Sequence, residues 1–304
     1  MTIDTVALFS PGDMGHAIGR VLVENGIRVV TNLDDRSDRT RELAEAADIV
    51  DLRDDLAAVE DSDLVLSILP PDRAYEMALR LASAIALAKD KPVYIDLNAI
   101  SPSATIEISE IIQGAGAAYV DGGIIGGPPK GTACPRLYIS GDDAILSHAM
   151  GLVEGGMDMR PISGGIGAAS ALKMCYAAIT KGLTAIATTS MTGAKAYGVD
   201  RELAAELNAS QRYLAERFDR DIPGMAPKAY RWVGEMEEIA RTFGEVGLDP
   251  RMYLGAAEIY KLITSTVLGD ETPEKRTVGF TAGEVADIAA AKLAEGAESG
   301  TTGE

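Results

Sequence analysis

The chain has 304 residues, 47% of them hydrophobic, and a formal net charge of −18 at pH 7. Its length allows one large domain or two smaller ones with a sizeable core. The negative charge disfavours nucleic acids and anionic membranes as partners. There is neither an apolar run of membrane-spanning length nor a signal-peptide pattern at the N-terminus. We therefore expect a cytoplasmic protein that does not bind membranes.

Residues that commonly bind metal ions are few and scattered. The two cysteines, Cys134 and Cys175, are far apart in the sequence. Neither histidine, His16 or His148, lies near a cysteine or an acidic ligand pattern. We predict neither a disulfide framework nor a metal site.

The first half of the chain alternates short apolar runs with amphipathic segments. The apolar runs predict strands at residues 6–9, 27–33, 48–52, 64–69, 93–97, 119–125 and 136–140. Helices are predicted from about residue 13 and at residues 37–47, 72–88 and 102–113, with Ser37 and Ser101 as N-caps. Repeated strand–helix units of this length imply a parallel sheet with right-handed crossovers.

A glycine turn lies between the first strand and the first helix. Gly12 and Gly15 fill the second and third positions of a G-x-G-x-x-G pattern, and Ser10 stands at the first. The second glycine lets a backbone approach a pyrophosphate, and the third lets the helix pack closely on the strand. We predict that this turn binds a dinucleotide through Ser10, Pro11, Gly12, Asp13, Met14 and Gly15. The alternative is an ordinary strand–helix turn in a doubly wound fold that binds another ligand.

The segment after the second strand determines the choice of cofactor. A carboxylate there binds the ribose of NAD, whereas an arginine accommodates the 2′-phosphate of NADP. The chain offers Arg36 and Ser37, with Arg39 close by, but also Asp34 and Asp35. We predict NADP, with NAD as the alternative. The alternative is that these residues form only a solvated charged loop, in which case the chain would have a weak preference between NADP and NAD.

Two later strand ends are also candidates for cofactor contacts. Leu69 and Pro70 follow the strand at 64–69, where proline forces the chain to turn, and we predict that they wall the nicotinamide. Asn98 follows the next strand and is a candidate to hydrogen-bond the carboxamide or the ribose. The alternative for Asn98 is an Asx-turn that ends the strand.

The pattern changes at the glycine-rich segment 161–167, after which we predict only helices. The first, at 168–197, has about 30 residues, is apolar on nearly every side and is expected to be buried. Others are predicted at 201–220, 225–246, 251–266 and 281–293, the last with a capping box of Thr281 and Glu284. We therefore predict a dinucleotide-binding domain at 1–161, a helical substrate and dimerisation domain at 162–294, and a disordered tail at 295–304.

Several motifs together resemble the β-hydroxyacid dehydrogenase and 6-phosphogluconate dehydrogenase superfamily, which includes the imine reductases. They are the glycine turn, the run Asp121-Gly122-Gly123-Ile124-Ile125-Gly126-Gly127, and residues 169–174 and 231–238. The last two stretches resemble the branch whose C-terminal region is a domain of unknown function. The resemblance implies a Rossmann-like domain followed by a helical domain. It also implies NAD(P)-dependent hydride transfer at an interdomain cleft, commonly in a dimer.

The resemblance also assigns roles to individual residues. It implies that Lys173 is the general acid/base and that the amides of Gly126 and Gly127 bind substrate. The chain departs from the family at two places: Ile125 replaces a substrate-binding serine, and Ala177 replaces the asparagine four residues after the lysine. These departures weaken the case for a simple β-hydroxyacid substrate but leave the redox chemistry intact.

The only tryptophan, Trp232, lies near Tyr230, Arg231 and Met236 on a predicted helix. It is a candidate to line the substrate site. The alternative is that this aromatic and methionine group belongs to the core or to a dimer interface.

We expect an NADP-dependent oxidoreductase that interconverts an alcohol and a carbonyl group on a small polar substrate. Imine reduction is the alternative, disfavoured because the Lys173 ammonium would face a cationic iminium. A non-catalytic dinucleotide-binding protein is the third possibility. The long small-residue helix predicts a homodimer through the helical domain, since a short bundle could not bury that helix completely.

Overall fold

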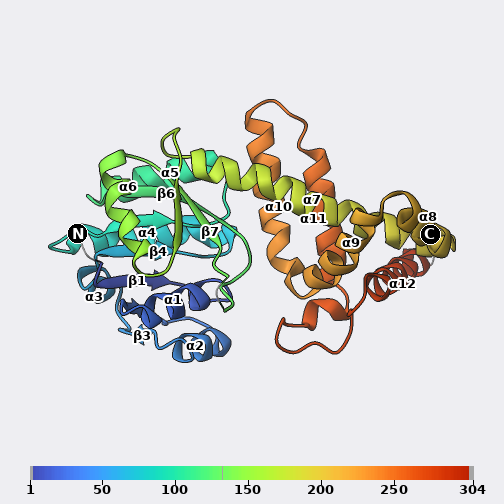
Figure 1. Cartoon of the computed structure of the whole chain (residues 1–304), viewed down its shortest axis with the longest axis horizontal. Coiled ribbons are helices and arrows are strands. Elements are labelled where there is room, and N and C mark those ends of the chain that lie inside the picture. Colours follow the sequence, from blue (N-terminus) through green and yellow to red (C-terminus); the bar gives the residue numbers. More distant parts are fainter. Residues whose placement is uncertain (1–2, 132, 301–304) are drawn as a thin grey trace. The chain divides into compact units, whose positions relative to one another are not determined.

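The computed structural model describes residues 3–131 and 133–300. The chain forms two compact units, Met1–Met174 and Cys175–Glu304 (Figure 1). The first contains the sheet and the second is helical, which confirms the predicted fold class.

Within the described residues, the first unit has eight strands in the order β3-β2-β1-β4-β5-β6-β7-β8. Neighbouring strands are parallel except β6 and β7, which are antiparallel. The segment between β6 and β7 is too short for the crossover that a parallel pair requires, so these strands form a hairpin. The strands are β1 Thr5–Phe9, β2 Arg28–Thr31, β3 Val50–Asp51, β4 Leu64–Ser67, β5 Val93–Asp96, β6 Tyr119–Ile125, β7 Arg136–Ser140 and β8 Asp158–Pro161.

Helices cover both faces of the sheet in the manner of a doubly wound fold. One face packs against α1 (Gly15–Glu24), α2 (Asp38–Glu45) and α6 (Asp143–Ala149). The other packs against α3 (Asp55–Glu60), α4 (Pro71–Leu87) and α5 (Pro102–Gly114). Strands β1, β4 and β5 lie in the middle and are almost wholly buried, as expected of continuous apolar runs covered on both sides.

The predicted strands at 119–125 and 136–140 are confirmed residue for residue. The first strand begins one residue earlier than predicted, and the other predicted strands are shorter than predicted. The N-caps are confirmed as well: Ser37 accepts from the amide of Thr40, and Ser101 from that of Ala104. The prediction omitted α3, α6, β8 and the single-turn helix Met150–Val153. These elements are short, so they carry little periodic signal.

The second unit begins within α7 (Ala168–Tyr197), whose predicted bounds are confirmed. After it come α8 (Asp200–Ser210), α9 (Arg212–Met225), a 3₁₀ turn at Ala226–Lys228, α10 (Ala229–Glu245), α11 (Arg251–Thr264), a 3₁₀ turn at Val267–Asp270 and α12 (Ala282–Gly300). The single helix predicted at 201–220 is wrong. Gln211 leaves helical geometry, with φ −136° and ψ 44°, and divides this segment into α8 and α9.

The last helix is longer than predicted. Its capping box is confirmed, since the amide of Glu284 donates to Thr281 Oγ1 (3.1 Å) and the amide of Thr281 to Glu284 Oε2 (3.3 Å). The helix continues to Gly300, so residues 295–300, predicted to be disordered, are helical. The rest of the predicted tail lies outside the described residues.

The prediction that α7 is buried on all sides is also wrong. Met174, Ala177 and Ala185 are buried, but Ile179 is 63% exposed and Ile186 is 54% exposed. Small residues let one side of the helix pack closely, while larger apolar residues occupy the other side. Among the described helices, none combines the length and hydropathy that crossing a membrane requires.

Candidate dinucleotide and substrate site

The glycine turn contains one closely packed glycine and one open glycine. A Cβ atom on Gly15 would lie 2.7 Å from the carbonyl oxygen of Ser10 and 3.2 Å from Leu8 Cδ2, so glycine allows the close approach of α1 to β1. A Cβ atom on Gly12 would meet no heavy atom within 4 Å. Ser10 has φ +65°, the left-handed conformation that favours glycine. The turn therefore keeps the expected geometry although serine replaces its first glycine.

The N-terminus of α1 faces this turn. Helix α1 begins at Gly15, slightly later than predicted, and within the described residues its N-cap Met14 makes no side-chain capping bond. The turn itself is fixed by the amide of His16, which donates to the carbonyl oxygen of Gly12 (2.9 Å). Helix N-termini present unpaired N–H groups and the positive end of the helix dipole. The open space at Gly12 and the uncapped helix together fit a pyrophosphate.

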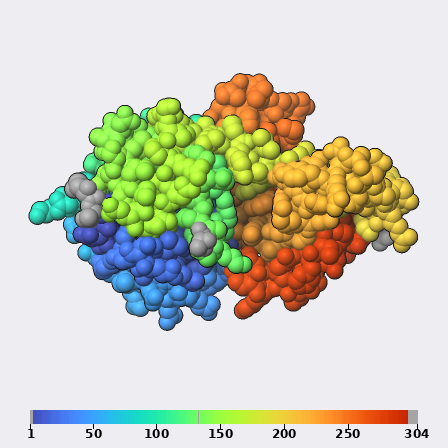
Figure 2. Space-filling view, in the orientation of Figure 1, coloured from blue at the N-terminus to red at the C-terminus, as the bar shows by residue number. Residues whose placement is uncertain are grey.

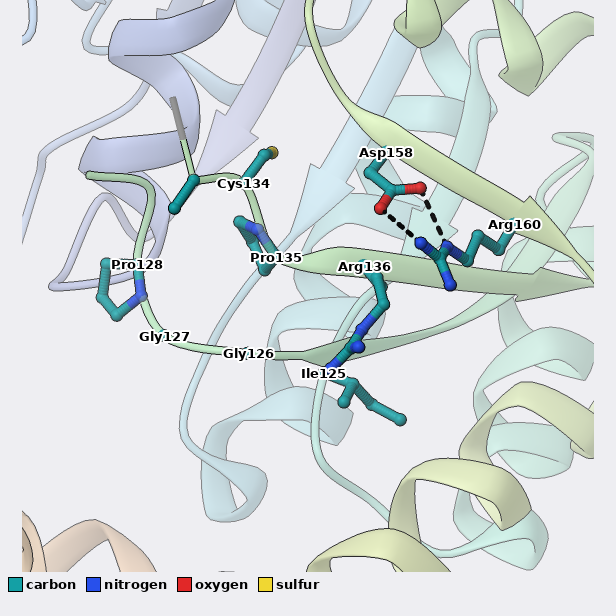
Figure 3. A pocket seen from close by; sticks show the side chains of 10 residues that line it. Ile125, Gly126, Gly127, Pro128, Cys134, Pro135, Arg136, Asp158 and Arg160 are labelled. Atoms are coloured by element: carbon teal, nitrogen blue, oxygen red, sulfur yellow. Dashed lines mark hydrogen bonds and ion pairs between the residues drawn. The ribbon is translucent and has the colours of Figure 1, made fainter. Parts of the chain in front are cut away.

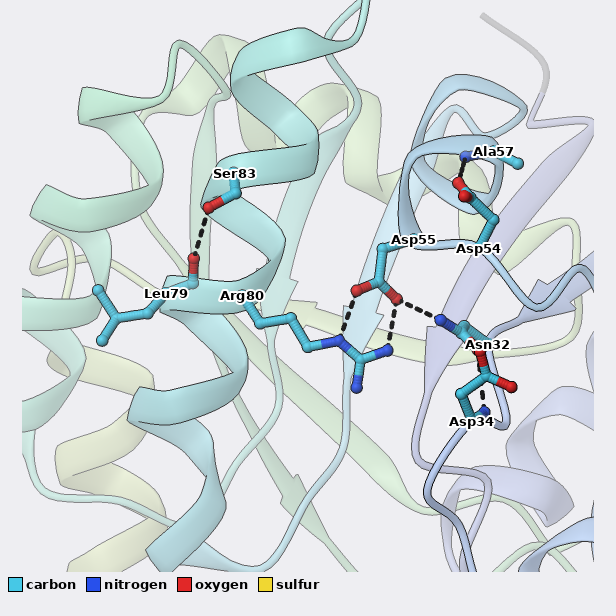
Figure 4. A network of polar contacts seen from close by, with 8 residues as sticks. All are labelled: Asn32, Asp34, Asp54, Asp55, Ala57, Leu79, Arg80 and Ser83. Carbon is cyan, nitrogen blue, oxygen red and sulfur yellow. Dashed lines mark hydrogen bonds and ion pairs between the residues drawn. The ribbon is translucent and has the colours of Figure 1, made fainter.

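A polar network surrounds the end of β2 (Figure 4). Asn32 directly follows the strand, and its Nδ2 donates to Asp55 Oδ1 (2.8 Å). Asp55 also accepts two hydrogen bonds from the guanidinium of Arg80. The amide of Asp34 donates to Asn32 Oδ1 (2.9 Å). The residue directly after β2 is therefore an amide held by Asp55, and the carboxylates Asp34 and Asp35 lie in the exposed loop beyond it.

Arg36 lies beside this network and is partly buried. Burial is the main cause that lowers the pKa of its guanidinium, and the positive charges of Arg80 and Arg73 lower it further. Its Nε is buried and has no hydrogen-bond partner in the described part of the chain. An anion would relieve both the repulsion and the missing hydrogen bond. Arg36 thus fits the role of a phosphate ligand.

Two neighbours of Arg36 have structural contacts. Ser37 caps α2, with its Oγ 3.3 Å from the amide nitrogen of Thr40. Arg39 forms an ion pair with Asp13, which connects α2 to the glycine turn. The predicted cofactor residues Asp13 and Ser37 therefore help to hold the two loops that meet at the carboxyl ends of β1 and β2.

Asn98 is buried and connects two strand ends. Its Oδ1 accepts the amide of Leu69 (2.6 Å), and its Nδ2 donates to Ser67 Oγ (2.9 Å). Leu69 is buried and Pro70 is exposed. These contacts fix the position of Leu69 and Pro70 after β4. Contacts of the three residues with a cofactor stay predictions.

Asp121 is the anchor of α7. Its carboxylate is fully buried in β6. Oδ2 accepts the amides of Gly167 (2.9 Å), Ala169 (2.9 Å) and Ser170 (3.1 Å), and Oδ1 accepts the hydroxyl of Ser170 (2.6 Å). The hydroxyl of Ser140, its partner across the β6–β7 pair, also donates to Oδ2 (2.9 Å). The negative charge stabilises the positive end of the helix and satisfies its first amides.

Lys173 lies one turn beyond this anchor. Its Nζ donates to the carbonyl oxygen of Ile124 (2.8 Å), and the residue is partly buried. A Cβ atom on Gly123 would lie 2.9 Å from both Lys173 Cβ and the carbonyl oxygen of Ala169. Glycine at 123 therefore lets the first turns of α7 lie directly against β6. Strand, anchor and helix together hold the ammonium near the carboxyl end of β6.

A second carboxylate, Asp96 on β5, lies next to Asp121 and has fewer hydrogen bonds. Burial raises the pKa of Asp96 to about 7; the nearby Asp121 charge acts in the same direction, and the Asn98 amide opposes both. Its Oδ1 accepts the amide of Asn98 (2.9 Å), while Oδ2 is buried without a partner in the described residues. One carboxylate is thus fully hydrogen-bonded and the other only partly.

Gly126 and Gly127 follow β6 and line a cavity of about 450 Å³ at the β6–β7 hairpin (Figure 3). Gly126 has φ +136°, and a Cβ atom there would lie 3.1 Å from Pro135 Cα. A Cβ atom on Gly127 would meet no heavy atom within 4 Å. The positive φ and the nearby Pro135 favour glycine at position 126. Gly127 leaves open space at the predicted substrate position.

Trp232 belongs to the second unit. Its ring packs edge-on against Tyr260, with the centroids 5.3 Å apart, and Lys181 Nζ lies 4.7 Å from its ring centroid. Lys181 also forms an ion pair with Glu235. These contacts tie α7, α10 and α11 together within the helical unit. A substrate contact of Trp232 stays a prediction.

The other predicted site residues gather at one edge of the sheet. The glycine turn, Leu69 and Pro70, Asn98, and Gly126 and Gly127 follow the carboxyl ends of β1, β4, β5 and β6, where ligands bind in such sheets. Sequence reasoning missed the anchoring role of Asp121 and its partners Ser140 and Ser170. A carboxylate inside an otherwise apolar strand was the available signal. The described residues contain no group of three or more potential metal ligands.

Family models identify both parts of the chain. Residues 5–155 match the NAD binding domain of 6-phosphogluconate dehydrogenase, and residues 194–263 match a domain of unknown function, DUF1932. The first match contains every strand from β1 to β7 and therefore the whole dinucleotide edge.

Solved structures give the same fold. A conserved protein of unknown function, described as similar to 3-hydroxyacid dehydrogenases, is 26% identical, with a TM-score of 0.64; the alignment covers 86% of this chain and 96% of that one. The 3-hydroxyisobutyrate dehydrogenase of Mycobacterium tuberculosis is 19% identical over 94% and 99% of the chains, with a TM-score of 0.69. An imine reductase from Myxococcus stipitatus, in complex with NADP+, is 16% identical over 93% and 99%, with a TM-score of 0.54.

These findings define a dinucleotide-dependent class of oxidoreductase, in agreement with the glycine turn and the strand ends. The chain belongs to the 6-phosphogluconate dehydrogenase-like superfamily, in the branch with the C-terminal domain DUF1932. The resemblance seen in the sequence motifs is confirmed.

Proposed function

We propose that the protein is an NADP(H)-dependent oxidoreductase that interconverts a hydroxyl and a carbonyl group on a small polar substrate. The observation that carries this proposal is the placement of Lys173. Asp121 anchors the first turn of its helix, and its ammonium lies at the carboxyl end of β6, on the ligand-binding edge of the sheet.

The residues that would hold the cofactor are those of the glycine turn, the N-terminus of α1, and Arg36. The open space at Gly12 admits a pyrophosphate, and the partly buried Arg36 guanidinium suits a 2′-phosphate. Leu69, Pro70 and Asn98 are the candidates beside the nicotinamide. When bound, NADPH supplies the hydride that a carbonyl carbon receives.

Lys173 performs the proton chemistry in this proposal. During reduction, negative charge develops on the substrate oxygen. A lysine ammonium stabilises that charge and donates one proton to the oxygen, which becomes a hydroxyl. In the oxidation direction the neutral amine takes the proton back. The hydrogen bond to the Ile124 carbonyl shows that this ammonium already faces an oxygen acceptor at this edge.

Imine reduction is the second candidate, favoured by the shared fold of the imine reductases. Its substrate is cationic in the reactive iminium form, and the Lys173 ammonium would repel it. We therefore rank it below carbonyl reduction, and a non-catalytic dinucleotide-binding role below both. Assays of wild-type protein with NADPH, against β-keto acids and cyclic imines in parallel, distinguish the two reactions. Faster turnover of imines would contradict the first choice.

The cofactor proposal is tested by binding. We expect Arg36→Ala to weaken NADPH binding by about 10- to 100-fold, because one charge-assisted phosphate contact is lost, and to leave NADH binding nearly unchanged. Arg41→Ala, which removes another partly buried arginine of the same region from α2, is the matched control. Isothermal titration of both nucleotides against all three proteins gives the answer. Equal affinity of wild-type protein for NADH and NADPH would contradict the NADP preference.

We also propose a homodimer formed through the helical unit. The exposed side of α7 carries Tyr176, Ile179 and Ile186 at helical spacing, and an apolar stripe of this kind is typical of a self-complementary interface. Light scattering tests this proposal. Wild-type protein is expected at twice the chain mass, and Ile179→Arg with Ile186→Arg at the chain mass. A wild-type monomer at micromolar concentration would contradict it.

A further inference from the structure

A row of polar residues crosses the middle of the sheet. It consists of four residues that pair in this order across neighbouring strands: Ser67 on β4, Asp96 on β5, Asp121 on β6 and Ser140 on β7. Paired residues point to the same face of a sheet, here the face covered by α3, α4 and α5. Each is no more than 2% exposed, so this polar row lies beneath the outer surface of the first unit, which Figure 2 shows in blue to yellow-green. Because water does not reach these groups, they depend on hydrogen bonds within the chain.

The two ends of the polar row hold different parts of the candidate site. At one end, Ser67 Oγ accepts a hydrogen bond from Asn98 Nδ2 (2.9 Å), and Asn98 Oδ1 accepts the amide of Leu69 (2.6 Å). Toward the other end, the carboxylate of Asp121 accepts the amide of Ala169 in the first turn of α7 (2.9 Å). The polar row thus connects the residues proposed to contact the nicotinamide with the helix that carries the proposed acid/base lysine.

The two carboxyl groups in the middle of the polar row are unequal. Asp121 accepts five hydrogen bonds, from three amides and two hydroxyls. Asp96 accepts the amide of Asn98 (2.9 Å), and its Oδ2 has no partner in the part of the chain that the structure describes. Two buried carboxylates side by side disfavour a second negative charge. The charge therefore belongs to Asp121, and Asp96 is the partner that takes up a proton.

The other groups around Asp96 are uncharged. They are Ser67 on β4, Tyr94 on its own strand and Tyr119 on β6, while the helices over the polar row contribute Thr105 on α5 and Ser170 on α7, whose hydroxyls hydrogen-bond each other (2.8 Å). Burial raises the pKa of Tyr94 and of Tyr119, and the charge of Asp96 raises both further, so the two phenols stay neutral. These neighbours, all among the described residues, include no cation that would balance a charge on Asp96.

Asn98 is the residue that would respond to such a charge. Burial raises the pKa of Asp96, while the backbone amide and the side-chain amide of Asn98 both oppose that rise, so the side chain lies within reach of the carboxyl group. A neutral Asp96 leaves Asn98 Nδ2 with Ser67 and Oδ1 with Leu69. A carboxylate is a stronger acceptor than a serine hydroxyl and would draw Nδ2 away from Ser67. That rotation would also turn Oδ1 away from the amide of Leu69.

We propose that Asp96 is a positioning residue for the cofactor: as a neutral carboxylic acid it holds Asn98 and Leu69 in the arrangement that binds the nicotinamide, and as a carboxylate it releases them. Asp96 acts through Asn98 and touches neither cofactor nor substrate. The change transfers one proton from Asp96 to solvent and otherwise exchanges only hydrogen bonds. This inference rests on the proposed function, because it concerns the cofactor contacts at the ends of β4 and β5.

The test compares NADPH with 2′-phospho-ADP-ribose, which carries the same phosphates but no nicotinamide. Calorimetry on the full chain gives both affinities from pH 6 to pH 8. Ionisation of the phosphates affects both ligands alike, so the ratio of the two affinities reports on the nicotinamide end. Because the pKa of Asp96 is about 7, its neutral fraction falls about 10-fold over this range, and the ratio should fall by the same factor.

Two variants with matched controls extend the test. Asp96→Asn cannot ionise and keeps an acceptor for the Asn98 amide, so its ratio should stay high and constant. Asp63→Asn changes a carboxylate at the amino end of β4 and should show the wild-type fall. Ser67→Ala removes the acceptor that holds Asn98 Nδ2, so its ratio should fall at lower pH. Ser109→Ala, at a buried serine of α5, should not shift the profile.

The possible results separate this inference from the proposed function. A constant ratio in wild-type protein that binds NADPH, or an equal fall in Asp96→Asn, would overturn the inference and leave the proposed function standing. Absence of NADPH binding at every pH would overturn both. If Asp96→Asn does not fold, the serine variants decide: a wild-type fall that Ser67→Ala does not move would contradict the role of Asn98.

Discussion

The two halves of the sheet hold their ligand-binding ends by different means. In the half formed by β1, β2 and β4, backbone geometry fixes the glycine turn: Gly15 approaches Ser10 closely, and Gly12 leaves open space. In the half formed by β5, β6 and β7, buried carboxylates fix the strand ends: Asp121 on β6 binds the first amides of α7, and Asp96 lies beside it on β5. The glycine turn depends on shape, and the anchor of α7 depends on a buried charge.

This difference has physical consequences for each half. The free energy of backbone packing does not depend on pH, whereas a buried carboxylate with a shifted pKa makes the stability of the fold depend on pH. A glycine turn also leaves a spacing that can be recognised in the sequence. A carboxylate buried in a strand is a single residue in the sequence. Its structural role depends on hydrogen-bond donors from distant segments, which the sequence does not reveal.

The largest effect is expected at the carboxylate of the second half. Asp121→Asn turns an amide group toward the N–H donors of α7 and should lower the free energy of unfolding by about 3 to 5 kcal/mol. Asp142 caps α6 through two amides in an exposed position, and asparagine caps equally well, so Asp142→Asn is a matched control with little effect. Urea unfolding measures both. Equal stability of the two variants would show that Asp121 is not an anchor.

The glycine turn provides a second pair of variants. Gly15→Ala forces a methyl group against the Ser10 carbonyl and should lower the free energy of unfolding by about 1 to 3 kcal/mol. The same variant should also weaken NADPH binding. Gly12→Ala should leave stability unchanged and weaken only NADPH binding, because its methyl group fills the open space. Thermal unfolding with a nucleotide titration separates these results. A stable Gly15→Ala protein with normal affinity would contradict the packing argument.

Asp96 gives the second half of the sheet a dependence on pH. Its pKa is raised to about 7 in the folded chain, from an ordinary value of 3.8. Its contribution to stability is therefore fully present below pH 3.8 and is lost as the pH rises through 7. Asp96→Asn keeps the acceptor for the Asn98 amide and cannot ionise. Between pH 5 and pH 8 the wild-type protein should lose about 2 kcal/mol relative to this variant. Parallel stability curves of the two proteins would count against the assignment.

The smallest effect is expected at Ser10. Its left-handed backbone costs free energy that glycine would not, while glycine also gains entropy in the unfolded chain. Ser10→Gly should therefore raise stability by less than about 1 kcal/mol and leave NADPH binding intact. Differential scanning calorimetry detects this shift. A clear loss of stability would mean that the serine side chain holds the turn.

The sequence predicted the first half of the site better than the second. Strand–helix alternation and the spacing of Gly12 and Gly15 are local signals, so the sheet and the turn could be predicted. The anchor at Asp121 could not, because its donors lie 19 to 49 residues away. The exposed side of α7 was missed for a similar reason: apolar periodicity shows which residues prefer burial but not whether this chain alone supplies a covering surface.

Arg136 illustrates the same limit. In the sequence it is one charged residue at the start of a strand. Only the register of β6, β7 and β8 shows that it lies beside Asp158, which also binds Arg160.

The most direct test of the central claim is single-turnover oxidation of bound NADPH by wild-type protein and by Lys173→Ala, with a saturating β-keto acid. The account predicts equal NADPH affinity in the two proteins and a rate in the variant lower by about 100- to 10,000-fold, the range typical of a lost general acid. Oxidation at the wild-type rate in Lys173→Ala would contradict it.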